Sequence, residues 1–241
     1  IDVSQYYGIV INLFFVASLV WFGIFNKIKQ SRRLNSKLKS DTIDFLRSKI
    51  SLPLFLGNHM QPHRYLMNLT SLLPTNAESI VLTGYFAINT YGLVAGYQVY
   101  EDNTIFGGDV FAQAFRYVAD RSGIMSFAHL PILVLFAGRN NILISASGLP
   151  YSTFMIFHKW TARVMFIDAA IHSVAYLAII LVDDTFFLYL PELWFISGFI
   201  AFFGALFICF FAIHNFRAKY YELFLVTHIV FAIMFLATCY T

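Results

Sequence analysis

Long apolar runs, separated by shorter polar stretches, dominate the hydrophobic pattern of this chain. They cover 7–25, 80–100, 122–138, 151–181, 193–213 and 220–241. Each is close to the roughly 20 residues that a helix needs to cross the hydrocarbon core of a bilayer. We therefore predict an all-α fold, a polytopic membrane bundle of about six spanning helices.

The placement of positive charge predicts how these helices are oriented. Only 12% of the residues are charged and 59% are hydrophobic, whereas a soluble domain averages about 25% charged residues. Nine of the 16 Lys and Arg residues lie between positions 27 and 64, and a second short basic stretch covers 214–219. Basic loops stay on the cytoplasmic side, so we expect both segments inside and the N-terminus outside.

The run 151–181 carries two histidines deep inside the predicted span. His158 and His172 are fourteen positions apart, which is about 40° short of four full turns, so both imidazoles share one helix face. Along the axis they are separated by roughly 21 Å, within a hydrocarbon slab about 30 Å thick. Ionisable residues at that depth are costly and are usually kept for a function. We therefore predict two metal centres, one near each leaflet.

The depth of each histidine in the membrane indicates which other histidine could bind the same iron. His228 lies about two turns inside the inner end of the last span, at a depth similar to that of His158. These two side chains are therefore placed to hold one iron from opposite sides. His172 needs a partner further out, at position 242, one beyond Thr241. His214 is also fourteen positions from His228, but a helix joining them would carry a polar stretch through the bilayer, so we expect a cytoplasmic turn there.

Two imidazoles favour a six-coordinate haem suited to electron transfer. The faces that carry the histidines also carry small residues, which leave room for the macrocycle: Ala162, Ala169, Ala232 and Cys239. Met165 and Phe235 fall midway between the two predicted haems, and we expect them to fill that gap. An ordinary helix-packing interface of small and aromatic residues is an equally good interpretation of these two positions.

Three basic residues are candidates for binding haem propionates. Lys159 and Arg163 follow His158 on the same span, and Arg139 lies in the preceding inner loop. The alternative for Lys159 is snorkelling to the interface, and for Arg163 an ion pair with Asp168 or Glu222. Arg139 is equally suited to anchoring the inner loop.

Other potential ligands are better explained by packing. His129 precedes Leu130-Pro131 in the third span, and a buried histidine bonded to a neighbouring carbonyl is the favoured interpretation. Cys209 and Cys239 lie in apolar runs, where thiols behave as small packing residues.

Several motifs together resemble the fungal ferric-chelate reductase family, whose wider superfamily includes the NADPH oxidases. They are 137–141 (AGRNN), 148–154 (GLPYSTF), 157–163 (FHKWTAR) and 172–173 (HS), and 221–228 (YELFLVTH) resembles that family's second haem helix. The resemblance covers roughly 122–241, about half of the chain, and the earlier residues add only a compatible layout.

This resemblance implies two stacked b-type haems between helices, with His158, His172 and His228 as iron ligands and the fourth ligand missing from this chain. The implied organisation is an N-terminal spanning helix with a basic cytoplasmic connector over 1–78, then a haem-binding transmembrane domain over 79–241. The family also carries a cytoplasmic module for FAD and NADPH after its last span, and this sequence holds no Gly-rich dinucleotide motif that would supply it.

The function implied is that of a ferric-chelate reductase using NADPH, with this chain as a membrane part that is not active alone. Electrons would pass from NADPH through FAD and the haems to ferric or cupric chelates outside, and no residue is assigned a catalytic role. We expect a plasma-membrane protein, with the vacuolar or another internal membrane as the alternative. Membrane lipid and a metal-uptake transporter are the expected partners, and nucleic acid is not.

Two other functions remain open. An NADPH oxidase would share the haem scaffold and deliver electrons to oxygen, producing superoxide. A non-redox transporter or scaffold would use the histidines for packing, although the matched depths of His158 and His228 argue against that interpretation.

Overall fold

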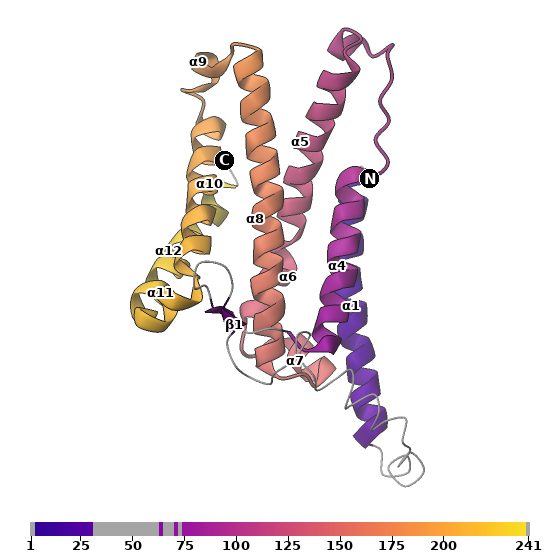
Figure 1. Ribbon diagram of the computed structural model, residues 1–241, viewed down its shortest axis with the longest axis vertical. Coiled ribbons are helices and arrows are strands. Elements are labelled where there is room, and N and C mark those ends of the chain that lie inside the picture. Colours follow the sequence, from indigo (N-terminus) through magenta and orange to yellow (C-terminus); the bar gives the residue numbers. More distant parts are fainter. Residues whose placement is uncertain (1–2, 31–62, 65–69, 72–73, 240–241) are drawn as a thin grey trace. The chain divides into compact units, whose positions relative to one another are not determined.

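The computed structural model describes residues 3–30, 63–64, 70–71 and 74–239 (Figure 1). The helices in chain order are α1 (Val3–Gln30), α4 (Asn76–Val94), the 3-10 helix η3 (Thr104–Phe106), α5 (Val110–Ala128), α6 (Leu130–Ala137), α7 (Ile142–Ser147), α8 (Tyr151–Val182), α9 (Phe186–Tyr189), α10 (Leu193–Phe211), α11 (His214–Lys219) and α12 (Tyr221–Thr238). Two short strands, β1 (His63–Arg64) and β2 (Thr70–Ser71), pair with each other. The predicted helical architecture is confirmed, and the basic connector lies largely outside the described residues.

Among the described residues, five segments are long and apolar enough to cross a membrane. They are Val3–Lys27, Val110–Ala137, Tyr151–Val182, Leu193–Phe211 and Tyr221–Thr238. The sixth expected span corresponds to α4, which has 19 residues but carries Asn76, Glu78 and Asn89, and these polar side chains lower its mean hydropathy. The chain is thus a multi-pass helical membrane protein.

Three helix ends differ from the sequence prediction, and each has a local cause. The helix α5 starts at Val110 rather than at 122, because Asp109 caps its first turn. The Asp109 carboxylate accepts hydrogen bonds from the backbone amides of Phe111 and Ala112, both at 2.9 Å. At its other end α5 ends at Ala128, and α6 begins at Leu130, since Pro131 has no N–H to continue the ladder of helical hydrogen bonds. The helix α4 stops at Val94, short of the predicted end at 100, and Gly96 follows in the left-handed region at φ 73°.

The described helices divide into two compact units. The first comprises Ile1–His63, Leu72–Gly92 and Phe127–Ala162, and the second comprises Arg64–Ser71, Leu93–Ser126 and Arg163–Thr241. The boundary falls inside continuous helices, so α8 contributes its first part to one unit and its second part to the other.

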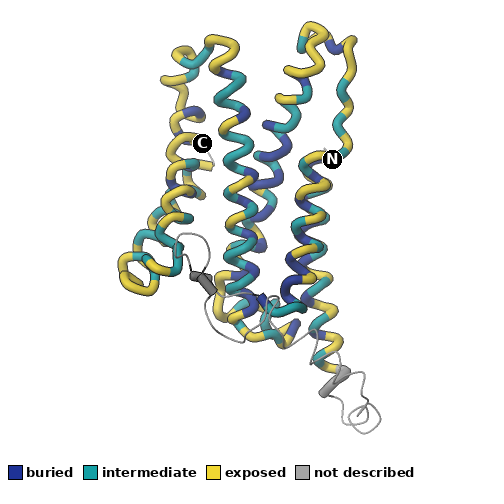
Figure 2. The backbone as a smooth tube through the Cα atoms, viewed as in Figure 1, coloured by how far each residue is buried: buried dark blue, intermediate teal, exposed yellow. Residues whose placement is uncertain are grey.

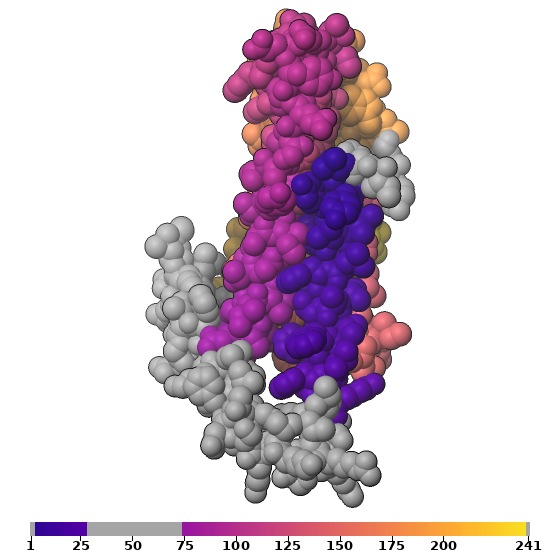
Figure 3. Space-filling view, turned by 90° about the vertical axis from the view of Figure 1, so that its right-hand side faces the viewer, coloured from indigo at the N-terminus to yellow at the C-terminus, as the bar shows by residue number. Residues whose placement is uncertain are grey.

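The first unit has an aromatic core around Phe15 of α1. Its ring centroid lies 4.8 Å from that of Tyr85, 5.2 Å from that of Phe136 and 5.7 Å from that of Phe157, and all four side chains are buried. The space-filling view shows α1 lying along α4 (Figure 3). This approach is close because Gly84 has no side chain: a Cβ there would lie 2.7 Å from the Phe14 ring.

A buried carboxylate ties α4 to α8 in the same unit. Glu78 and Thr75 form a capping box, with the Thr75 amide donating to Oε2 of Glu78 at 2.8 Å and the Glu78 amide donating to the Thr75 hydroxyl at 3.3 Å. The other carboxylate oxygen accepts from the Thr153 hydroxyl at 2.6 Å. One side chain thus caps α4 and holds the first turn of α8.

Replacing this carboxylate is expected to destabilise the protein. Glu78→Ala removes the acceptor of one helix cap and leaves the buried Thr153 hydroxyl without its partner, a loss of about 2 kcal/mol in the free energy of unfolding. The measurement is thermal unfolding of the detergent-solubilised protein. Glu101→Ala, which changes an exposed carboxylate, is the control, and equal melting temperatures for the two variants would contradict this interpretation.

The second unit is built on two packed pairs of helices. Here α10 and α12 lie side by side (Figure 1), with the rings of Phe207 and Phe231 stacked at 5.4 Å and Gly204 leaving room for the Met234 methyl group. The Ser126 hydroxyl of α5 donates to the Met165 carbonyl of α8 at 2.9 Å. These contacts place the second part of α8 against α5.

The segment after α4 is also fastened to α5. The guanidinium of buried Arg121 donates to the Ala95 carbonyl and lies 3.8 Å from the centroid of the Tyr97 ring. Burial raises the pKa of the Tyr97 hydroxyl, and the charge of Arg121 opposes that change only in part. Tyr97 is therefore neutral at physiological pH, and its ring serves as a packing surface for the arginine.

The pattern of exposure agrees with a lipid-facing bundle. The helix α12 has no buried residue, and Figure 2 shows much of α10 and α12 as exposed. The exposed apolar residues of these two helices include Phe203, Val230 and Ile233. Within a bilayer such surfaces face acyl chains, which are as apolar as the side chains themselves.

Candidate functional site

Both candidate histidines of the fourth predicted span lie on one unbroken helix. The prediction of 151–181 agrees with α8 to within one residue. Two local signals define its start: Gly148 ends α7 in the left-handed region at φ 65°, and Pro150 immediately precedes the first residue of α8. His158 falls in the first unit and His172 in the second.

In the first unit, His158 is hydrogen-bonded to a neighbouring helix. Its Nδ1 lies 3.0 Å from the carbonyl oxygen of Leu133 in α6. A carbonyl oxygen only accepts, so Nδ1 must carry the proton and donate. The lone pair of the neutral imidazole is then on Nε2, the nitrogen that would bind a metal.

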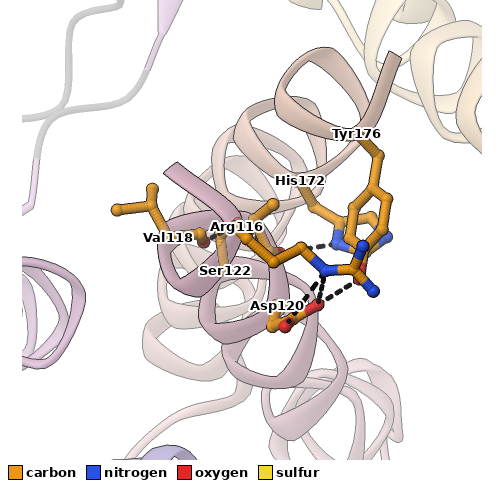
Figure 4. A network of polar contacts seen from close by, with 7 residues as sticks. Arg116, Val118, Asp120, Ser122, His172 and Tyr176 are labelled. Atoms are coloured by element: carbon orange, nitrogen blue, oxygen red, sulfur yellow. Dashed lines mark hydrogen bonds and ion pairs between the residues drawn. The ribbon is translucent and has the colours of Figure 1, made fainter. Parts of the chain in front are cut away.

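His172 makes the same kind of bond in the second unit. Its Nδ1 donates to the carbonyl oxygen of Ala119 in α5 at 2.8 Å (Figure 4). Gly123, one turn further along α5, lets the ring come this close. A Cβ at Gly123 would lie 2.5 Å from Nδ1 and 2.8 Å from Cε1 of His172.

The two histidines therefore share one chemical arrangement at separate places along α8. Metal-ligating histidines almost always donate their other ring N–H to a carbonyl, carboxylate or water, which fixes the tautomer and raises the basicity of the ligating nitrogen. His158 and His172 both meet this condition. Their donor chemistry fits axial ligation of haem iron.

His228 lies on α12 in the second unit, half-buried, with its ring centroid 5.3 Å from that of Phe224. Because His158 belongs to the first unit, the pairing of His158 with His228 stays a prediction. The rejected alternative, His214, lies on the separate short helix α11, which ends before Tyr220. His214 and His228 are thus not on one helix, as predicted.

The residues predicted to lie between the haems occupy α8 and α12. Met165 is buried, and its carbonyl accepts the bond from Ser126 described above. Phe235 is half-buried on α12. Their proposed placement between two haems stays a prediction.

The basic candidates differ in their exposure. Arg139 is exposed, with its guanidinium 5.9 Å from the centroid of the Tyr151 ring. Lys159 is half-buried in the first unit, and Arg163 is exposed in the second unit. The propionate-binding role of all three stays a prediction.

His129 is buried and has a hydrogen-bond partner, as the sequence indicated. It is fully buried, and its Nε2 lies 3.2 Å from the side-chain amide oxygen of Asn89. The Tyr85 ring packs against it at 5.6 Å. The partner is a side-chain amide oxygen from α4, which no local pattern around His129 could reveal.

Within the part of the chain that the structure describes, no group of three or more His, Cys, Asp or Glu side chains comes together to hold a metal ion. A haem iron needs only two axial ligands from the protein, because the porphyrin supplies the other four. Isolated histidines, each oriented by a backbone carbonyl, agree with that kind of centre.

Comparisons with known proteins agree with one another. The family model described as "Ferric reductase like transmembrane component" matches residues 122–239. The chain is 37% identical over 240 residues to ferric/cupric reductase transmembrane component 2 of Saccharomyces cerevisiae, covering 100% of this chain and 34% of that protein. Ferric reductase transmembrane component 4 of the same yeast is 36% identical over 239 residues, covering 99% of this chain and 33% of that protein.

A more distant relative has the same kind of name. Ferric/cupric reductase transmembrane component 1 of Candida albicans is 29% identical over 171 residues, which cover 70% of this chain and 22% of that protein. No solved structure matches the chain. The chain spans about a third of the length of the yeast relatives that it matches over its whole length.

Proposed function

The chain belongs, through residues 122–239, to the family of ferric reductase-like transmembrane components, and from this premise we propose that it is the haem-bearing membrane part of a ferric or cupric reductase. Relatives aligned over the whole chain are named as ferric or ferric/cupric reductase components. The acceptor proposed here is accordingly a ferric or cupric chelate, rather than oxygen.

The observation that carries the proposal is the shared bonding of the α8 histidines. His158 and His172 each donate Nδ1–H to a backbone carbonyl of a neighbouring helix, at 3.0 and 2.8 Å. Histidines with only a packing role have no need for the same tautomer at two depths of one apolar helix. A proton on Nδ1 leaves Nε2 able to bind iron, and metal-ligating histidines almost always donate their other ring N–H in this way.

The proposed role of this chain is to bind and orient the haems and to keep water away from them. His158 of α8 and His228 of α12 would hold the inner haem, and His172 the outer one. When bound, the b-type haems supply one-electron transfer from NADPH and FAD on the cytoplasmic side to the chelate outside. The surrounding apolar helices exclude water, so that the electron is not lost to side reactions.

The proposed orientation follows the positive charge. The Tyr151 end of α8 would face the cytoplasm, together with the basic segment around 27–49 and the helix α11 with Arg217 and Lys219. The Val182 end would then face outward, which makes His172 the ligand of the outer haem. The plasma membrane is the proposed location, and a metal-uptake transporter is the proposed partner for the reduced metal.

Spectroscopy of the full-length protein that contains this chain tests the proposal. We expect b-type haem bands in the reduced-minus-oxidised spectrum, and NADPH-dependent reduction of a ferric chelate by the same membranes. Absence of haem bands would overturn the proposal. Haem with superoxide output and no chelate reduction would favour the oxidase function instead.

A further inference from the structure

A polar and aromatic cluster lies beside His172 in the second unit (Figure 4). Arg116 and Asp120, one turn apart on α5, form an ion pair with 3.3 Å between Nε and Oδ1. The hydroxyl of Tyr176, on α8, donates to the same carboxylate oxygen of Asp120. Three side chains from two helices thus join in one network.

Tyr176 is held at two points by this network. Its hydroxyl is bonded to Asp120, and the Arg116 guanidinium carbon lies 4.7 Å from its ring centroid, within the range of a cation–π interaction. The same guanidinium keeps the Asp120 carboxylate in place to accept the hydroxyl. The tyrosine ring is therefore fixed relative to both α5 and α8.

The fixed ring packs directly on the candidate ligand. The ring centroids of Tyr176 and His172 are 4.8 Å apart, with 55° between the planes. The bond from Nδ1 to the Ala119 carbonyl holds one point of the imidazole, but a ring held at one point can still pivot about that bond. The contact with Tyr176 provides the second constraint and stops the pivot.

We infer that Tyr176, anchored by Asp120 and Arg116, is a positioning residue for His172 that sets the plane of its imidazole at the outer haem. The inference rests on the proposed function, because it assigns His172 to a haem. Tyr176 does not touch the iron, and it acts only through the orientation of the ligand ring. Residues that contact a metal ligand without touching the metal tune the orientation and basicity of that ligand, and hence the electronic state of the metal.

The arrangement also gives a reason for the ion pair in the charged first part of α5. Arg116 and Asp120 are each a little under half exposed, at 43% and 44%. An exposed ion pair one turn apart on a helix adds only about 0.3–0.5 kcal/mol to stability. The cluster therefore adds little to the free energy of unfolding. Holding the His172 ring in one orientation needs a fixed geometry rather than a large free energy.

The test is electron paramagnetic resonance and potentiometric titration of the oxidised full-length protein, which resolve the two haems. Tyr176→Leu removes the ring, and we expect the low-field signal and the midpoint potential of one haem to shift while those of the other stay unchanged. Tyr176→Phe and Asp120→Ala each remove the hydrogen bond between the Tyr176 hydroxyl and the Asp120 carboxylate. Each should shift the same signal in the same direction by a smaller amount. Because both break one bond, their effects should not add in the double variant.

The control is Val174→Ala, at an exposed position on the same helix, which should leave both signals unchanged. Two unshifted haems in Tyr176→Leu would overturn the inference while leaving the proposed function intact. Should Tyr176→Leu fail to fold, Tyr176→Phe decides, since it keeps the ring volume. Wild-type protein without any haem signal would overturn the proposed function, and the inference with it.

Discussion

The variants His158→Ala and His172→Ala are each expected to remove one of the two proposed haems and to stop electron transport across the membrane. An alanine side chain has no lone pair to bind iron, so the haem that depends on the replaced histidine loses one of its two axial ligands. The haem-to-protein ratio, taken from the reduced-minus-oxidised spectrum, should fall to about half in each variant, because each haem depends on its own axial pair. Ferric-chelate reduction should be lost with it.

The matched control for this prediction is His214→Ala. His214 lies on α11, a different helix from α8 and α12, which carry the proposed ligands, and its removal should leave the haem content unchanged. Full haem content in His158→Ala or His172→Ala would contradict the ligand assignment. Haem loss in His214→Ala would contradict the placement of α11 at the membrane surface.

Sequence reasoning succeeded where the signal was local and strongly periodic. The helix α8 was predicted to within one residue because a long apolar run follows Gly148 and Pro150. The start of α5 was missed because the stretch 110–121 carries charged residues that look like a loop. Two of those charges, Arg116 and Asp120, form an ion pair one turn apart on the helix, and Asp109 caps its first turn.

The features of the candidate site likewise include some that the sequence could predict and some that it could not. The histidines could be found from their spacing and depth, since both follow from position along one helix. Their hydrogen-bond acceptors, the carbonyls of Leu133 and Ala119, could not, because every residue has a carbonyl and only the packing of helices selects one. The contact of Tyr176 with Asp120 depends in the same way on how α5 and α8 pack.

The close approach of His172 to α5 depends on the missing side chain of Gly123, and Gly123→Ala is expected to displace the imidazole ring. The new Cβ would lie 2.5 Å from Nδ1 and 3.1 Å from Cγ, so the imidazole must turn away and lose its bond to the Ala119 carbonyl. Loss of the hydrogen-bond acceptor of a ligating histidine typically lowers metal affinity or activity about 10–100-fold. We expect the outer haem to be weakly retained and the inner haem to be unaffected.

Global stability should change much less, which separates this effect from misfolding. Alanine is better than glycine in a helix interior by about 0.8–1 kcal/mol, and this gain offsets part of the cost of overpacking, about 1–3 kcal/mol. Haem content and thermal unfolding measured on the same preparation distinguish the two effects. Gly198→Ala in α10 is the matched control, because an added Cβ there meets no atom of another helix within 4 Å, and it should keep both haems. Wild-type haem content and spectrum in Gly123→Ala would show that His172 does not need the close approach to α5.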